Sequence, residues 1–198
     1  MIPVGHMAKR ISSAPDWLKA HRVSDVYSVS GCVSEDFADY VNFWRHNGYW
    51  LFDSPASIRK VAGEKSISLD GTKLFYYEAH ESEFDGKIWK SYSSEPSIPT
   101  NVDPAKLKHL EGFDVVTFQA HNHPECSPLS CDGLAEDIQT NVHCLLESFD
   151  KAETKLNDGK LVKCEAGPYR IFAVYSVRLA LTTDRQRRSR PQAFRTAL

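Results

Sequence analysis

The sequence lacks the short motifs by which the commonest nucleotide-binding proteins and serine hydrolases are recognised. Its 198 residues contain no P-loop, no GxGxxG and no GxSxG. They also contain no CxxC pair, the spacing typical of structural zinc sites. No apolar run approaches the roughly 18 residues of a membrane span, and the segment Met1–Trp17 has no apolar core of signal-peptide length. We therefore expect a cytoplasmic protein without a membrane partner.

The cysteine count and the charge distribution narrow the range of partners. Five cysteines, an odd number, and the lack of an export signal indicate reduced thiols rather than a disulfide framework. The formal net charge is −2. Six arginines and one acid follow Val177, so the rest of the chain is distinctly acidic. An acidic body favours a basic protein partner and disfavours nucleic acid, except through the Arg-rich tail.

The composition and the hydrophobic pattern predict one folded unit. A hydrophobic fraction of 41% and a charged fraction of 25% are typical of a soluble domain. Strands outnumber helices, and the helices are short. We expect a single compact α+β (mixed α/β) domain over residues 16–177, built on a central mixed sheet. A flexible N-terminal extension (1–15) and a basic disordered tail (178–198) flank it, and Met7 is an alternative start to Met1.

Local patterns predict the individual elements. Helices are expected from Ser34 to Asn47, from Ser54 to Gly63 and over 104–110, 134–140 and 149–156, each opened by a capping residue or closed by glycine. Strands are expected over 23–30, 49–52, 113–118, 142–146 and 169–177. A three-stranded meander over 66–69, 73–84 and 87–92 turns at Asp70-Gly71 and Asp85-Gly86. The apolar run 113–118 is typical of a central strand buried on both faces.

Acidic residues gather in the predicted meander. Its middle strand carries Glu78, Glu81 and Glu83, and Asp85 follows in the turn. On a strand, Glu81 and Glu83 share one face and Glu78 lies on the other. These four residues are our candidates for binding a basic partner protein. The alternative is that the charges only protect an outer strand from edge-to-edge aggregation.

Two histidines follow the predicted core strand in the string His121-Asn122-His123-Pro124. This string resembles the HxHP motif of the JAMM zinc metalloproteases. The resemblance implies that His121 and His123 bind zinc and that Glu78, on an upstream strand, activates the bound water. The family continues with SxxD at fixed spacing, where this chain has Cys131 and Leu134. Asp132 or Asp137 can replace that aspartate only if the loop differs in length, and we take Asp137 as the third ligand.

The same region offers other chemistries. Its histidines and cysteines can form a structural zinc site, although the spacing is unusual and the adjacent His143 and Cys144 point to opposite faces of a strand. Cys126 or Cys131 can act as a nucleophile if a base such as His143 lies within reach. A disulfide between Cys126 and Cys131 can act as a redox switch. The string His123-Pro124-Glu125 is not followed by the PCxxC of the cytidine deaminases.

Two functions are therefore predicted. The first is a non-enzymatic protein-binding domain of the inhibitor or immunity type, which uses the acidic sheet face and needs no cofactor. The alternative is a JAMM-like zinc hydrolase with Glu78 as the base and His121, His123 and Asp137 as metal ligands. Whether the chain is an enzyme stays open at this stage, because no complete catalytic set is visible in the sequence.

Overall fold

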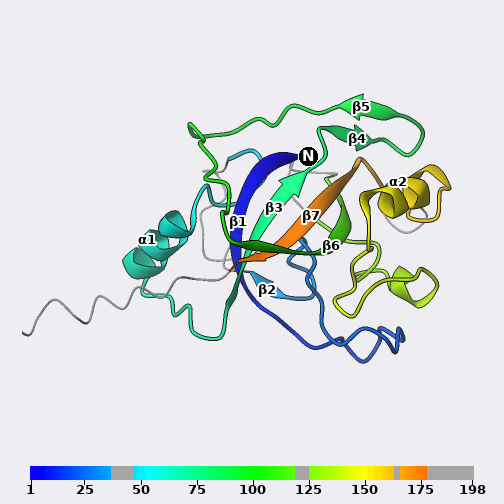
Figure 1. Cartoon of the computed structure of the whole chain (residues 1–198), viewed down its shortest axis with the longest axis horizontal. Helices are drawn as coiled ribbons and strands as arrows, with labels where there is room; N and C mark the ends of the chain where they lie inside the picture. The colour runs from blue at the N-terminus through cyan, green and yellow to red at the C-terminus, as the bar shows by residue number, and fades with distance from the viewer. Residues whose placement is uncertain (37–46, 119–124, 163–165, 178–198) are drawn as a thin grey trace, which may run out of the picture.

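The computed structural model describes residues 1–36, 47–118, 125–162 and 166–177, which form one sheet with two α-helices (Figure 1). The elements in chain order are β1 (Ile2–Arg10), β2 (Glu35–Asp36), α1 (Pro55–Lys65), β3 (Lys73–Ala79), β4 (Ser82–Phe84), β5 (Trp89–Ser91), β6 (Lys108–Thr117), a 3-10 turn (Leu134–Glu136), α2 (Phe149–Asn157) and β7 (Tyr169–Val177). This is an α+β domain with a low helix content. Within the described ranges, no helix has the length and apolar character needed to span a membrane.

β7 lies at the centre of the sheet, because it pairs with β3, β4 and β6. The order of strands is β2-β1-β3-β7-β4-β5, with β6 as the further partner of β7. Every strand pair in the described part of the chain is antiparallel, so the prediction of a mixed sheet is wrong. The predicted central strand 113–118 belongs to β6, which has β7 as its one strand partner among the described residues. The central position instead falls to β7, whose first six residues are all buried.

Apolar side chains are buried on both faces of the sheet. One cluster contains Val116 and Phe172 together with side chains of β1 and β3. The other contains Val115 and Ile171 and includes the buried face of α2. Neighbouring residues of one strand therefore serve opposite cores, because successive side chains point to opposite faces. The predicted burial of the 113–118 strand on both faces is confirmed.

The N-terminus is a sheet strand, which corrects the prediction of a flexible extension over residues 1–15. β1 pairs with β3 from Ile2 opposite Ala79 to Lys9 opposite Lys73. Val4 and Met7 are buried in the core. The polar residues His6 and Lys9 of the same strand are also buried, and they obscured its pattern in the sequence. The predicted tail 178–198 lies outside the described residues.

The helices predicted over 54–63 and 149–156 are confirmed as α1 and α2, and both begin at a serine cap. The hydroxyl of Ser54 accepts a hydrogen bond from the backbone N–H of Ser57 (3.2 Å) at the start of α1, where Pro55 takes the first position. The hydroxyl of Ser148 caps α2 in the same way. α1 continues two residues beyond Gly63 and ends where Ser66 adopts the left-handed conformation.

Other predicted elements are wrong, because tertiary pairing overrides local propensity. Glu35 and Asp36 form β2 instead of a first helical turn, and residues 37–46 lie outside the description. β6 begins at Lys108 and takes the last three residues of the helix expected over 104–110, and residues 104–107 form neither helix nor strand. The predicted strands over 23–30, 49–52 and 142–146 form isolated bridges or irregular chain. The helix predicted over 134–140 is only the 3-10 turn. Of the predicted meander, the middle strand is divided into β3 and β4, the last strand is β5, and no strand forms at 66–69.

Candidate metal centre

Three cysteine side chains from two distant segments meet beside the end of β6. Cys32 comes from the chain before β2, and Cys126 and Cys131 come from the loop that follows β6. The three sulfur atoms all lie within 4.8 Å of one another, and Cys32 Sγ is 3.5 Å from Cys126 Sγ. None of the three forms a disulfide. Among the described residues this is the one group of three possible metal ligands so closely placed.

The loop after β6 is shaped by backbone pairing with the last residue of that strand. Thr117 and the segment Glu125–Cys126 exchange hydrogen bonds: the N–H of Thr117 donates to the carbonyl of Cys126 (2.9 Å) and the N–H of Glu125 donates to the carbonyl of Thr117 (2.9 Å). The carbonyl of Ser127 then accepts from the N–H of Cys131 (2.8 Å) in a tight turn. This turn brings Cys131 back to the side on which Cys126 lies.

Ser30 joins the Cys32 segment to this loop. Its hydroxyl donates to the carbonyl of Glu125 (2.5 Å) and accepts from the N–H of Cys32 (3.1 Å). The Sγ atom of Cys32 lies 3.2 Å from the same Glu125 carbonyl, to which it donates when the thiol is protonated. The hydroxyl of Ser30 also lies 3.8 Å from Cys131 Sγ. The two segments are thus fixed against each other before any ligand binds.

The thiols share their protons unequally. The hydrogen bond with Cys131, followed by those with Ser30 and Cys126 and by the charge of Lys9, lowers the pKa of Cys32 to about 5, although burial opposes the change. The same hydrogen bond and burial raise the pKa of Cys131 well above its ordinary value. Cys32 is therefore the thiolate of the group, and Cys131 donates a proton to it. The thiolate is the form of cysteine that binds metals and reacts as a nucleophile.

The sulfur positions fit a tetrahedral thiolate site. Zinc–sulfur bonds of about 2.3 Å at tetrahedral angles place the sulfurs about 3.8 Å apart. The 3.5 Å between Cys32 and Cys126, and the 4.8 Å bound on all three sulfurs, are close to this spacing. Soft thiolates select zinc, copper(I) and iron–sulfur clusters over calcium or magnesium. The residues present therefore fit a zinc ion.

Of the metal site predicted from the sequence, the structure describes only Asp137 and the base Glu78. His121 and His123 lie outside the described residues. Asp137 lines a cavity of about 660 Å³ with Lys155 and Lys160, and it does not belong to the thiol group. The predicted base Glu78 forms an ion pair with Lys108 and accepts from the hydroxyl of Tyr175 (3.0 Å).

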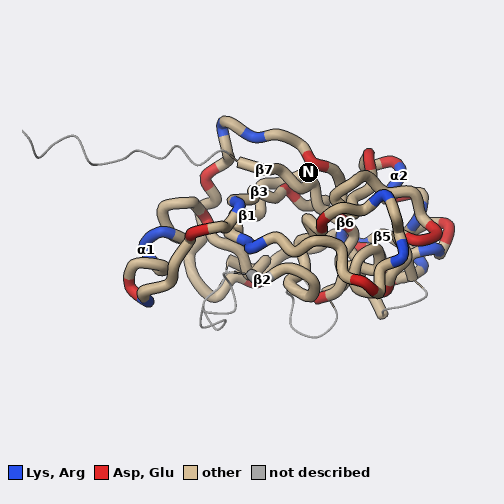
Figure 2. The backbone as a smooth tube through the Cα atoms, turned by 90° about the horizontal axis from the view of Figure 1, so that it is seen from below, with Lys and Arg blue, Asp and Glu red and all other residues tan. Residues whose placement is uncertain are grey.

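The acidic residues of the predicted partner face have different surroundings. Glu81 is exposed. Glu83 lies 2.9 Å from the guanidinium of Arg170, which is almost fully buried. Asp85 pairs with Lys90 (2.5 Å) and caps its own turn. Figure 2 shows acidic and basic residues interspersed around β5 and α2, so this end of the molecule is not uniformly acidic. Partner binding there stays a prediction.

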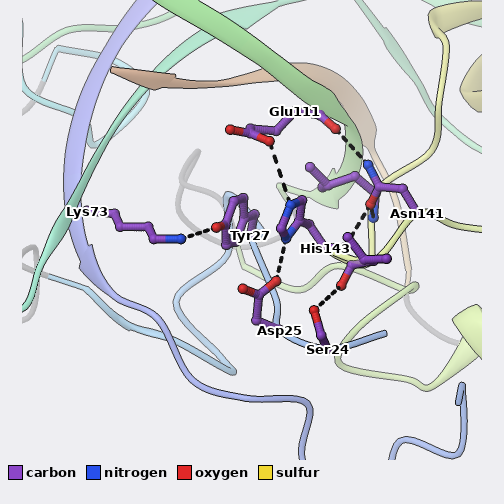
Figure 3. A network of polar contacts seen from close by, with 9 residues as sticks. Ser24, Asp25, Tyr27, Lys73, Glu111, Asn141 and His143 are labelled. Carbon is purple, nitrogen blue, oxygen red and sulfur yellow. Dashed lines mark hydrogen bonds and ion pairs between the residues drawn. The ribbon is translucent and has the colours of Figure 1, made fainter. Parts of the chain in front are cut away.

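His143 lies in a separate polar cluster (Figure 3). Its Nδ1 is 2.5 Å from Asp25 Oδ1 and its Nε2 is 3.7 Å from Glu111 Oε2. The ring stacks on Tyr27 at a centroid distance of 4.0 Å. Because both ring nitrogens face carboxylates, neither is directed at a cysteine. This arrangement does not support the hypothesis of a Cys–His hydrolase with His143 as the base.

Sequence reasoning missed Cys32, the residue that completes the group. It lies 94 positions before Cys126, and no local spacing connects the two. The signal available in the sequence was the odd number of cysteines, together with two cysteines close to the histidines His121 and His123. Comparisons with protein families, with curated proteins and with solved structures found no match to this chain.

Proposed function

We propose that this chain is a zinc-binding protein in which Cys32, Cys126 and Cys131 hold the ion. The observation that carries the proposal is the convergence of the three sulfurs within 4.8 Å from two segments distant in sequence. Cysteines outside disulfides otherwise behave as small buried hydrophobic side chains. Here Cys32 is exposed and the other two are half-buried, so packing alone does not account for the group.

The ligand set favours a structural role over a hydrolytic one. Structural zinc sites typically use four cysteines, three cysteines with one histidine, or two of each, whereas zinc proteases such as thermolysin use histidines and a carboxylate and keep one position open for water. Three thiolates donate enough charge to give the zinc complex a net negative charge, which weakens its ability to acidify bound water. The three sulfurs therefore support a stabilising ion that joins the segment 28–32 to the loop 125–131.

The fourth ligand is open to experiment. A closed tetrahedral site needs one further donor. The sequence prediction names His121 and His123, which precede Cys126 by five and three residues. Both lie outside the described residues, so their role as ligands stays a prediction. If either is the fourth ligand, the zinc is held by three cysteines and one histidine.

For the role of the zinc-stabilised domain we keep the first function predicted from the sequence, which is binding rather than catalysis. The partner remains a basic protein in this proposal. Glu81 and Asp85 are the exposed members of the four acidic candidates, and Asp85 is already paired with Lys90. The JAMM-like hydrolase remains the alternative. It requires His121, His123 and a carboxylate, rather than the cysteines, to hold the metal.

The test is the zinc content of the purified full-length protein and of single variants. We expect one zinc per chain in the wild type and a large loss in Cys32→Ala, Cys126→Ala and Cys131→Ala. Cys144→Ala is the matched control, because Cys144 is buried in the core and does not belong to the thiol group. It should retain its zinc.

Two outcomes separate the alternatives. Retention of zinc in all three cysteine variants together with its loss in His121→Ala and His123→Ala would support the hydrolase. A wild-type protein that takes up less than about a tenth of an equivalent of zinc under reducing conditions would refute the proposal.

A further inference from the structure

Two buried charged side chains lie behind the thiol group. Lys9 belongs to β1 and Asp114 belongs to β6, and both have an exposed fraction of 0%. Buried charges are costly unless they are paired and hydrogen-bonded. The hydrogen bonds of Lys9 and Asp114 therefore indicate what the two buried charges do in the fold.

Lys9 holds the segment that leads to Cys32. Its ammonium group donates to three successive carbonyls, those of Ser28 (2.7 Å), Val29 (2.9 Å) and Ser30 (2.9 Å). An ammonium group has three protons, and these bonds match them in number. The chain from 28 to 30 is thus curved around one positive charge, two residues before Cys32.

Asp114 holds the same segment and the cysteine loop together. Its Oδ2 accepts from the hydroxyl of Ser28 (2.7 Å) and from the N–H of Val29 (2.9 Å). Its Oδ1 accepts from the hydroxyl of Ser127 (2.6 Å), the residue that follows Cys126 and forms the turn to Cys131. One carboxylate on a sheet strand therefore fixes both cysteine-bearing segments.

We infer that Lys9 and Asp114 are positioning residues that pre-organise the thiolate metal centre. The inference rests on the proposed zinc site and identifies what holds its ligands in place. Sites are more precise when their supporting side chains come from rigid sheet strands and have saturated hydrogen bonds. The positive charge of Lys9 also favours the negatively charged complex of zinc with three thiolates. The loss of such supporting groups typically lowers metal affinity by about 10- to 100-fold.

The test compares Lys9→Met and Asp114→Asn with Lys73→Met. Lys73 is the matched control, because it lies opposite Lys9 in the β1–β3 pair and is exposed. We measure the zinc affinity of each full-length protein by competition with a chromophoric chelator. Lys9→Met and Asp114→Asn should each bind zinc about 10- to 100-fold more weakly than the wild type, and Lys73→Met should remain within about 2-fold.

A second readout separates positioning from a general loss of stability. Cobalt(II) replaces zinc in thiolate sites, and its absorption spectrum reports the arrangement of its ligands. A variant that is merely less stable gives the wild-type spectrum once it is saturated with cobalt. We expect Lys9→Met and Asp114→Asn to give altered spectra at saturation, whereas Lys73→Met should give the wild-type spectrum.

The outcomes also distinguish this inference from the proposed function. If the wild type binds zinc and both variants bind it with wild-type affinity and spectrum, the inference fails and the zinc site stands. If the wild type binds no zinc, both fail. If neither variant folds, Ser28→Ala removes one donor to Asp114 while keeping both charges. It should weaken zinc binding by at least about 3-fold, and unchanged binding would overturn the inference.

Discussion

The segment 24–32 contributes to two polar clusters that differ in the kinds of group they bring together. In the His143 cluster, each ring nitrogen faces a carboxylate and the ring stacks on Tyr27. In the thiol cluster, three groups of one kind converge, and weak sulfur hydrogen bonds are their main polar contacts with one another. The first cluster is complete in itself, because each polar ring atom already faces a polar partner. The second is a set of like ligands, which is what a metal ion requires.

The reactivity of the cysteines should show the largest difference. In metal-free protein at about pH 7, Cys32 should react with iodoacetamide at least about 100-fold faster than Cys144. Cys32 is exposed, and its lowered pKa of about 5 leaves it ionised at this pH. Burial raises the pKa of Cys144 to about 12. Peptide mass spectrometry gives the rates. The rate at Cys32 should fall as the pH drops through its pKa of about 5, and equal labelling of both cysteines would contradict this account.

Removal of zinc should cost more stability than any change in the His143 cluster. An ion that binds only the folded state stabilises it by about 2.7 kcal/mol when its free concentration is about 100 times the dissociation constant. Urea unfolding with and without a chelator measures this difference. Cys126→Ala serves as the control, since its stability should not respond to the chelator. An equal response in the variant and the wild type would show that the metal binds elsewhere.

His143→Ala should lower the free energy of unfolding by about 2 kcal/mol, because it removes the hydrogen bond with Asp25 and the closer approach to Glu111. It should leave the zinc content unchanged. Urea unfolding and metal analysis of the same sample test both parts. If this variant loses its zinc, the His143 cluster and the thiol cluster are not independent, and the account is contradicted.

Glu81→Lys should have the smallest effect on the fold, within about 0.5 kcal/mol, because the side chain is exposed. Its value lies in the test of the partner surface. Glu83 is less suitable, because reversing its charge would leave the buried Arg170 unpaired. If capture of basic proteins at low salt is the same for Glu81→Lys as for the wild type, this surface does not bind them.

The sequence predicts those parts of the fold whose signals are local. The cap Ser54 marks the start of α1, Asp158-Gly159 marks the end of α2, and the apolar run 169–177 marks β7. β1 escaped detection, because its buried Lys9 is satisfied by carbonyls of residues 28–30, which lie 19 to 21 positions away. The thiol centre escaped for the same reason. Two of its cysteines were visible as candidates, but the third is brought to them only by the fold.

The nature of the metal shell is the central claim, and X-ray absorption at the zinc edge measures it directly. The protein is purified with zinc under reducing conditions and the first coordination shell is fitted. We predict three sulfur neighbours at about 2.3 Å and one lighter neighbour at about 2.0–2.1 Å. A shell made only of nitrogen and oxygen, as two histidines and a carboxylate would give, would contradict the thiolate centre and favour the hydrolase.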